Sequence, residues 1–212
     1  MNFSTVFYVV NFLLINTWVL KQRKILLLLS NGFEILEASA FIDVMGWNLE
    51  EGNKTTRLFT AAMGNEVSSS FNMHFKVDFT LDEVDVDFFD ALVIPGGFKS
   101  YNYYEDAYSS VFLNLIQRFK NQNKIIASVC VGALPLAKSG VLKNKKGTTY
   151  NNSEYLNTLK KHDVVLSKKS IVIEDKLITS NGPSTAINVA FLLLEMLTGK
   201  ENTLKIKMLM GY

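Results

Sequence analysis

The sequence predicts an α/β protein built on a mostly parallel sheet, and three observations support this prediction. Short apolar runs rich in branched residues alternate with longer segments of helical periodicity. Small residues and glycines directly follow two of these runs, as at tight turns. The 212 residues suffice for one domain with a sizeable core. In such a fold, ligand sites lie at the carboxyl ends of the strands.

The expected strands are short. Residues 91–94 and 125–129 are continuous apolar runs typical of buried strands, and residues 24–30 read as the first strand. The remaining expected strands, with a hairpin turn at "EDK" between the last two, are 56–62, 66–69, 74–79, 164–166, 171–174 and 177–180.

The segments between these strands have helical patterns. Residues 108–121 carry five apolar side chains on one face, at Val111, Phe112, Leu115, Ile116 and Phe119. The other expected helices are 35–47, a short one that follows Cys130, 153–161, 184–198 with Gly199 as its C-cap, and 203–210.

Composition narrows the range of partners. The 22 basic and 20 acidic residues give a net charge of +2 and are interspersed, so we expect no nucleic-acid partner. The basic cluster Lys143, Lys145 and Lys146 is expected to be a solvated loop. The single cysteine rules out an internal disulfide and a cysteine-rich metal site, and it fits a reducing cytoplasm. We expect neither a metal nor a cofactor.

Residues 1–23 form a hydrophobic extension ahead of the predicted domain, residues 24–212. The apolar run 6–20 contains two asparagines and a threonine, and it is shorter than the roughly 20 apolar residues of a membrane span. No positive charge precedes it, unlike in a secretory signal. Three interpretations stay open: a surface helix, a weak anchor, or a start site assigned too early, with Leu20 as a natural-looking start. We regard a membrane role as unlikely.

Cys130, the only cysteine, is either a core residue or a nucleophile. Free cysteines are often buried and inert. Cys130, however, sits between an expected strand and an expected helix, with small Ser128 and Gly132 two residues to either side. A nucleophile elbow needs this arrangement. The helix N-terminus would lower the pKa of the thiol, so we expect a thiolate at neutral pH.

Two further turns follow expected strands. In "NGFEILE", Glu34 is explained by the helix dipole, whereas Glu37 lies one turn later and could meet the cysteine. In "PGGF", residues 95–98, adjacent glycines form a plain tight turn or expose an amide N–H to an oxyanion.

Together, "GFEILE", "PGGF", "ASVCVGALPLAKSGVLKNKKGTTY" and "LITSNGPSTA" resemble the ThiJ/PfpI superfamily over residues 24–212, and within it the bacterial ThiJ-named branch. The resemblance implies a flavodoxin-like fold, similar to class I glutamine amidotransferases, in which helices flank a mostly parallel sheet. It also implies a homodimer and a small-molecule substrate. The superfamily contains a parkinsonism-associated redox protein, intracellular peptidases, and bacterial proteins named for thiazole monophosphate biosynthesis.

The resemblance assigns roles residue by residue. Cys130 matches the elbow cysteine, and Glu37 matches the acidic residue whose protonated carboxyl hydrogen-bonds the thiolate. Gly97 and the amide of Val131 match the oxyanion site, and Gly96 shapes that turn.

The chain departs from the family pattern at two positions. Many members place histidine where Tyr150 stands, and the protease-like members have histidine in place of Val131. The only histidines, His74 and His162, are expected at the surface, so peptidase activity is unlikely. Tyr150 is either a polar partner of the site or a packed aromatic residue.

The last candidates come from two loops. In "SNGPST", Ser184 as an N-cap explains the pattern, while the resemblance implies that Asn181 and Gly182 wall the site. Three tyrosines follow the glycine turn and form a pocket rim, a packed loop or a dimer contact: Tyr101, Tyr103 and Tyr104.

Three functional hypotheses follow for a cytoplasmic protein. In the first, Cys130 attacks a small carbonyl or amide compound, as in a glyoxalase, deglycase or amidohydrolase. In the second, Cys130 is a redox sensor oxidised to a sulfinate. In the third, the protein binds ligands or partners with an idle site.

Overall fold

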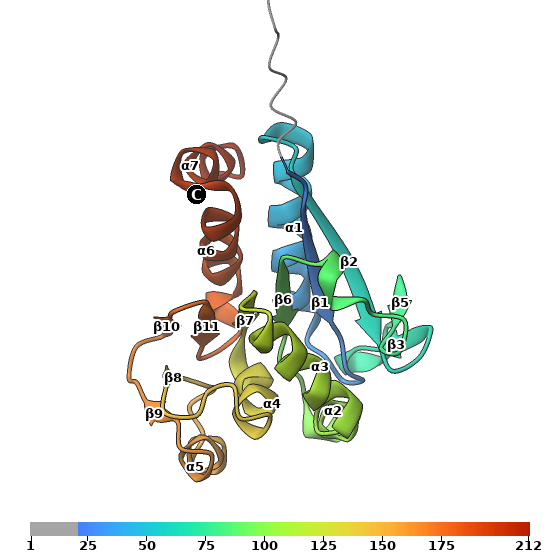
Figure 1. Cartoon of the computed structure of the whole chain (residues 1–212), viewed down its shortest axis with the longest axis vertical. Coiled ribbons are helices and arrows are strands. Elements are labelled where there is room, and N and C mark those ends of the chain that lie inside the picture. The colour runs from blue at the N-terminus through green and yellow to red at the C-terminus, as the bar shows by residue number, and fades with distance from the viewer. Residues whose placement is uncertain (1–20) are drawn as a thin grey trace, which may run out of the picture.

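The computed structural model describes residues 21–212, so the expectations for residues 1–20 lie outside the described part of the chain. A seven-stranded sheet has the order β10-β11-β7-β6-β1-β2-β5, and only the β10–β11 pair is antiparallel (Figure 1). Its strands are β1 (Arg23–Leu28), β2 (Thr56–Ala62), β5 (Phe79–Thr80), β6 (Ala91–Ile94), β7 (Ile125–Ser128), β10 (Ile171–Glu174) and β11 (Leu177–Ser180). Two small pairs join β3 (Glu66–Ser68) to β4 (His74–Lys76) and β8 (Lys146–Gly147) to β9 (Val165–Leu166).

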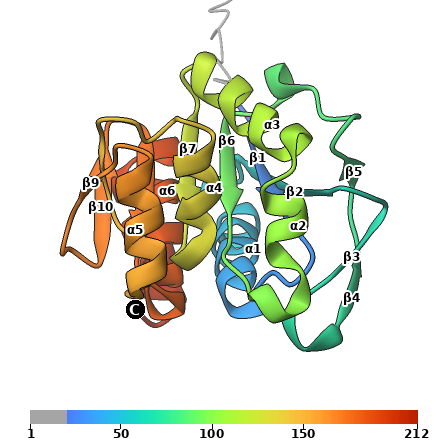
Figure 2. The same cartoon turned by 90° about the horizontal axis from the view of Figure 1, so that it is seen from below.

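Helices cover both faces of the sheet, as the two views show together (Figures 1 and 2). α1 packs against α6 and β2, while α3 packs against α4, β6 and β7. The helices are α1 (Ile35–Glu51), α2 (Tyr103–Ala107), α3 (Ser110–Asn121), α4 (Ala133–Lys138), α5 (Ser153–Lys161), α6 (Ala186–Thr198) and α7 (Lys200–Leu209). The expected flavodoxin-like α/β fold is confirmed.

β1 lies in the interior of the sheet, because its sequence suits burial on both faces. It pairs in parallel with β2 on one side and with β6 on the other. From Ile25 onward its side chains are buried, and β6 and β7 are buried throughout. Continuous apolar runs are what a doubly covered parallel sheet requires. This buried core fixes where the strands end, and therefore where a site can form.

Most expected elements are present, with local differences. The bounds of β2, β6, α5, β10 and β11 are as predicted. The expected strand 74–79 instead divides into β4, antiparallel to β3, and β5, parallel to β2. Between them, the Asp78 carboxylate accepts hydrogen bonds from the Thr60 N–H and hydroxyl, at 2.7 and 2.8 Å. This side chain competes with regular strand pairing, which explains the break.

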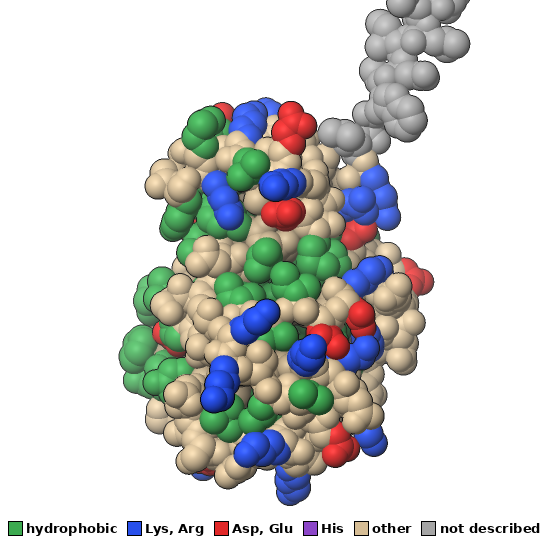
Figure 3. Space-filling model, turned by 90° about the vertical axis from the view of Figure 1, so that its left-hand side faces the viewer, with side chains coloured by type: hydrophobic (Ala, Val, Ile, Leu, Met, Phe, Trp, Pro, Cys, Tyr) green, Lys and Arg blue, Asp and Glu red, His purple; other side chains and the backbone are tan. Residues whose placement is uncertain are grey.

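The basic cluster is solvated, as expected, but it is not wholly a loop. Lys146 lies in β8. Lys145 Nζ lies 2.7 Å from Asp175 Oδ2. Lys143 Nζ lies 3.7 Å from Asp163 Oδ2. On the face that Figure 3 shows, Lys and Arg side chains are separated by other residues and form no continuous basic patch.

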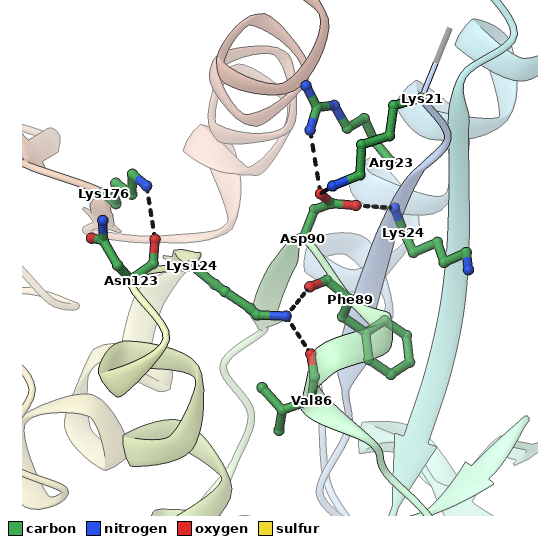
Figure 4. A network of polar contacts seen from close by, with 9 residues as sticks. All are labelled: Lys21, Arg23, Lys24, Val86, Phe89, Asp90, Asn123, Lys124 and Lys176. Atoms are coloured by element: carbon green, nitrogen blue, oxygen red, sulfur yellow. Dashed lines mark hydrogen bonds and ion pairs between the residues drawn. The ribbon is translucent and has the colours of Figure 1, made fainter. Parts of the chain in front are cut away.

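The amino end of the sheet is closed by a polar network (Figure 4). Asp90 Oδ1 lies 3.3 Å from both Lys21 Nζ and Arg23 Nη1, and Asp90 Oδ2 accepts the Lys24 N–H at 3.0 Å. Nearby, Lys124 Nζ donates to the carbonyls of two residues at the end of a short turn, Val86 and Phe89. The cations of this network are therefore engaged with partners from the protein itself.

Two features are absent from residues 21–212, the part of the chain that the structure describes. In this part of the chain, no helix combines the length and apolar character needed to cross a membrane. The same residues contain no group of three or more His, Cys, Asp or Glu side chains arranged to hold a metal ion.

Candidate functional site

Cys130 lies at a nucleophile elbow. Its φ of +55° is in the left-handed region, which non-glycine residues seldom occupy outside strained functional turns. The Val129 N–H donates to the Ile94 carbonyl at 3.2 Å, so the turn stays attached to β6. A Cβ at Gly132 would lie 2.4 Å from the Ile94 oxygen, so only glycine fits there. The predicted strand–turn–helix geometry is present.

The glycine turn after β6 meets this elbow. A Cβ at Gly96 would lie 3.0 Å from Cys130 Cβ, from Glu37 Oε2 and from the Val131 nitrogen. A Cβ at Gly97 would lie 2.2 Å from the Gly32 oxygen. The absent side chains allow three elements to converge, namely the start of α1, the glycine turn and the elbow. The structure thus brings together five of the residues that we singled out from sequence.

Glu37 is fully buried beside the thiol. Its Oε2 accepts the Gly96 N–H at 2.5 Å, while Oε1 makes no hydrogen bond with residues 21–212. Burial raises the pKa of Glu37 to about 8, although the Gly96 hydrogen bond opposes this shift and the Glu34 charge adds to it. A pKa of about 8 favours the protonated carboxyl at neutral pH.

The thiol itself is shifted in the direction opposite to our expectation. Burial raises the pKa of Cys130, whose side chain is only 7% exposed, and an ionised Glu37 raises it further. The Val131 N–H, which donates to the sulfur, lowers the pKa but does not outweigh burial. The expected thiolate at neutral pH is thus not the form that this environment favours. The helix that follows, α4, has only six residues, and its first turn cannot offset the lost solvation.

Glu34 also takes part in the charge balance of this site. Burial raises the pKa of its carboxyl. The helix dipole alone therefore does not account for Glu34. The two acids lie three residues apart on one helix face, so ionisation of one disfavours ionisation of the other.

The two amides predicted to form an oxyanion site make no backbone hydrogen bonds within residues 21–212, although the Val131 N–H donates to the sulfur. Within the described residues, neither the Gly97 N–H nor the Val131 N–H donates to a backbone carbonyl. Gly97 is held by an antiparallel bridge to Phe33, in which the neighbouring Phe98 N–H donates to Gly32 at 3.0 Å. This bridge positions the Gly97 amide without using it.

The other residues that we predicted to wall the site come from two loops near the elbow. They are Tyr150, Asn181 and Gly182. Thr149 hydroxyl donates to the Cys130 carbonyl at 2.8 Å, which places the next residue, Tyr150, beside the elbow. Tyr150 is 47% exposed, and its ring would lie 3.8 Å from a Cβ at Gly182. Asn181 donates its N–H to the Ser170 carbonyl at 2.9 Å. These contacts support a wall, but they give the Tyr150 hydroxyl no partner at the sulfur.

The expected N-cap at Ser184 is wrong by one residue. α6 begins at Ala186, and Thr185 occupies the cap position after a short 3-10 turn. The Thr185 hydroxyl donates to the Gly182 carbonyl at 2.6 Å, which holds the loop closed beneath Tyr150.

The three tyrosines after the glycine turn have separate roles. Tyr103 is fully buried, and its hydroxyl donates to the Pro95 carbonyl at 2.7 Å. Tyr104 packs edge-on against Tyr103 at 5.2 Å between ring centroids, and Tyr101 packs against Phe71 at 5.7 Å. The packed-loop interpretation is therefore correct for Tyr103, which supports the glycine turn from below.

Neither histidine is placed at the elbow. His74 is exposed and its Nδ1 lies 2.9 Å from the Ser68 hydroxyl, while His162 is the C-cap of α5. A Cys–His pair is absent from residues 21–212.

Sequence reasoning missed Thr149 and the support role of Tyr103. Thr149 stands in the quoted "GTTY", where the two small threonines before the tyrosine were a usable signal. Tyr103 lies in the polar stretch "YNYYED", which gives no hint of complete burial.

Comparison with known proteins agrees with this geometry. The DJ-1/PfpI family pattern matches residues 23–196. An uncharacterized protein of Methanocaldococcus jannaschii is 26% identical over 79% of this chain and 78% of its own length. Drosophila melanogaster protein dj-1beta is 32% identical over 65% of this chain and 72% of its own length. A deglycase of Thermococcus kodakarensis is 34% identical over 59% of this chain and 71% of its own length.

Solved structures give the same result. The crystal structure of Drosophila melanogaster DJ-1beta aligns with a TM-score of 0.76 at 28% identity, and the alignment covers 89% of this chain and 97% of the other. The family match covers well over half of the chain, and the elbow, the buried acid and the glycine turn all stand inside it. The chain belongs to the DJ-1/PfpI family.

Proposed function

We propose that the protein is a cytoplasmic enzyme in which Cys130 attacks a small carbonyl or amide compound, in the manner of a glyoxalase, deglycase or amidohydrolase. One observation carries the proposal: Cys130, Glu37 and the Val131 amide converge on the space that a side chain at Gly96 would fill. Deglycases are among the named relatives, which supports the carbonyl class. The missing Cys–His pair argues against a peptidase.

The protonated Glu37 suits addition to a carbonyl group. The sulfur of Cys130 forms a bond to the carbonyl carbon, while the π electrons move onto oxygen. Glu37 gives its proton to that oxygen and receives the thiol proton in return, so the product is a hemithioacetal and Glu37 is regenerated. The Gly97 and Val131 amides stabilise the oxygen as charge develops on it. In this mechanism no free thiolate has to precede the attack, which agrees with the raised pKa of the thiol.

An amide substrate would follow a related course. The sulfur bond forms, and the amine leaves with the proton of Glu37 while Glu37 takes the thiol proton. Water then adds its hydroxyl to the acyl carbon and returns a proton to the sulfur, which releases the carboxylic acid and the free thiol.

A redox sensor is the second candidate, because Glu37 Oε1 lacks a partner beside the sulfur. Two peroxide molecules would oxidise Cys130 in turn, first to a sulfenic acid and then to a sulfinate, each being reduced to water or an alcohol; the protonated Glu37 and the Val131 amide would hold the sulfinate. The chain has no second cysteine, so no internal disulfide would form.

Turnover of methylglyoxal and of small amides by the wild type and by Cys130→Ala tests the first proposal. We expect turnover that the alanine variant loses. Absence of turnover in the wild type, together with a stable sulfinate after two equivalents of peroxide, would transfer the assignment to the sensor.

Assembly is a separate proposal. We propose a homodimer, as the family resemblance implied, and sedimentation at micromolar concentration tests it. A protein that sediments only as a monomer would contradict this proposal.

A further inference from the structure

A cavity of about 460 Å³ lies close to the Cys130 elbow. Its walls come from the segment after β8, from α5, from the segment after β9 and from the end of β11. Thr149 lines this cavity and donates its hydroxyl hydrogen to the Cys130 carbonyl, at 2.8 Å. The Thr149 side chain therefore links the wall of the cavity to the backbone of Cys130.

Four polar side chains line the cavity without using their polar groups on the protein: Thr148, Asn151, Lys168 and Asn181. Thr148 is 4% exposed, and only its backbone N–H is engaged, with the Thr179 hydroxyl at 3.0 Å. Among residues 21–212, no side-chain hydrogen bond forms from Thr148, Asn151 or Asn181, and Lys168 has no ion pair. The wall thus includes a hydroxyl, two amides and an ammonium group that have no side-chain partner within residues 21–212, and Asn151 and Lys168 are also exposed to solvent.

The charge of the lining indicates the kind of ligand. Lys168 is the only charged residue in the wall, and no carboxylate neutralises it there. Two leucines, Leu156 and Leu166, supply an apolar side. An ammonium group with hydroxyl and amide donors matches the oxygens of a carboxylate or a phosphate.

The cavity at the other end of the sheet provides a contrast. It is larger, about 750 Å³, and it contains more cations. There, however, Lys21, Arg23 and Lys124 already bind Asp90 or backbone carbonyls. The number of cations is thus a poor guide to a site, and the unpaired groups favour the cavity beside Cys130.

We propose that the cavity lined by Thr148, Asn151, Lys168 and Asn181 is a subsite for the anionic end of the substrate, a carboxylate or a phosphate, while the carbonyl end meets Cys130. This inference rests on the proposed function. It narrows the proposed substrate class from small carbonyl compounds in general to those that carry a carboxylate or a phosphate at the end away from the carbonyl group.

Kinetics with two matched aldehydes test the subsite. Methylglyoxal is neutral, whereas 4,5-dioxovalerate presents the same oxoaldehyde with a distal carboxylate. In Lys168→Met we expect KM for dioxovalerate to rise about five- to tenfold, as for the loss of one partly exposed charged hydrogen bond. KM for methylglyoxal should stay within about twofold. Lys169→Met is the matched control, because Lys169 is the exposed neighbour outside this cavity. Equal effects of both variants, or equal effects on both aldehydes, would overturn the subsite.

Binding measurements separate this inference from the proposed function. Inorganic phosphate and glutarate are titrated into Cys130→Ala, which cannot turn over substrate, while amide resonances are followed by NMR. We expect saturable shifts at residues 148–151, 168 and 181 that weaken at least fivefold in the additional Lys168→Met variant and persist with Lys169→Met. A response to only one probe identifies phosphate or carboxylate as the group bound. Saturable shifts without turnover of either aldehyde would refute the proposed function but leave an anion site. No saturation by either probe at 20 mM would refute the subsite itself.

Discussion

The two ends of the central sheet use polar residues in opposite ways. At the amino end, Asp90 binds Lys21, Arg23 and the Lys24 N–H, and the network is closed on itself (Figure 4). At the carboxyl end, Glu37 Oε1 and the Gly97 amide have no partner among the described residues.

This difference indicates that the amino end stabilises the fold, whereas the carboxyl end is suited to bind a ligand. A buried polar group without a partner costs roughly 1–3 kcal/mol, so the carboxyl end carries a penalty that the amino end avoids. A ligand that supplies the missing partners would recover part of that cost. Each prediction below alters one end and asks whether the other end is affected.

The largest effect is expected from Gly96→Val. Its side chain would enter the space bounded at 3.0 Å by Cys130, Glu37 and Val131, so these groups must separate. We expect alkylation of Cys130 and any turnover to fall by at least about 100-fold, since misplacement of about 1 Å can cost that much. Gly46→Ala in α1 is the control, because a Cβ there meets nothing within 4 Å. Unchanged alkylation in Gly96→Val would show that the convergence is irrelevant to the thiol.

The next effect is a pH dependence of stability that Glu37 generates. Its pKa of about 8 in the folded state exceeds the ordinary value of about 4.5. Between these values the folded state holds a proton that the unfolded state has released, so stability falls as pH rises. The slope approaches about 1.4 kcal/mol per pH unit at most.

Urea denaturation of the wild type and Glu37→Gln at pH 5, 6, 7 and 8 measures this slope. The free energy of unfolding of the wild type should fall relative to that of the variant, by a few kcal/mol over the whole range. Titrating groups remote from Glu37 are shared and cancel in the difference, whereas Glu34, whose ionisation depends on Glu37, contributes to it. Parallel curves for the two proteins would mean that Glu37 is ionised in the folded state.

A smaller effect is expected at the amino end. Asp90→Ala leaves the Lys24 N–H without its acceptor and removes two ion pairs, at a site where the carboxyl is 17% exposed. We expect a loss of about 1–2 kcal/mol in stability, with unchanged alkylation of Cys130. Asp43→Ala, an exposed position on α1, is the control. A changed alkylation rate in Asp90→Ala would mean that the two ends are coupled.

The same carboxylate makes a second, testable contribution at low pH. Burial opposes ionisation of Asp90, but the Lys24 N–H, Lys21 and Arg23 together lower its pKa below the ordinary value. Its stabilisation is therefore present above pH 4 and is lost as pH falls through the lowered pKa. Glu37 acts in the opposite direction, so the two ends respond oppositely to pH.

The sequence could predict those features that are determined by residues close together along the chain. Strand β6 was predictable because burial on both faces favours an uninterrupted apolar run, and β7 departs from that pattern only at its last residue, Ser128. The elbow at Cys130 was predictable because only small neighbours fit that turn.

Properties set by distant contacts were not predictable. The burial of Tyr103 depends on the Pro95 carbonyl that accepts its hydroxyl, and the tyrosine-rich segment carries no sign of that partner. The raised pKa of Cys130 depends on how deeply the elbow lies, a property of the packed fold rather than of its local sequence. The helix N-terminus was visible in the sequence, and the loss of solvation that outweighs it was not.

The smallest effect is expected from removing residues 1–19, which tests whether the amino end is complete without them. β1 is hydrogen-bonded on both sides by β2 and β6, and the Arg23 N–H donates to Thr55 at 2.6 Å. Every one of these contacts lies within residues 21–212. A chain that starts at Leu20 should therefore be soluble, with a free energy of unfolding within about 0.5 kcal/mol of the full chain, as for changes away from packed features. Aggregation or a loss of several kcal/mol would mean that the extension completes the amino end, and that our interpretation of the start site is wrong.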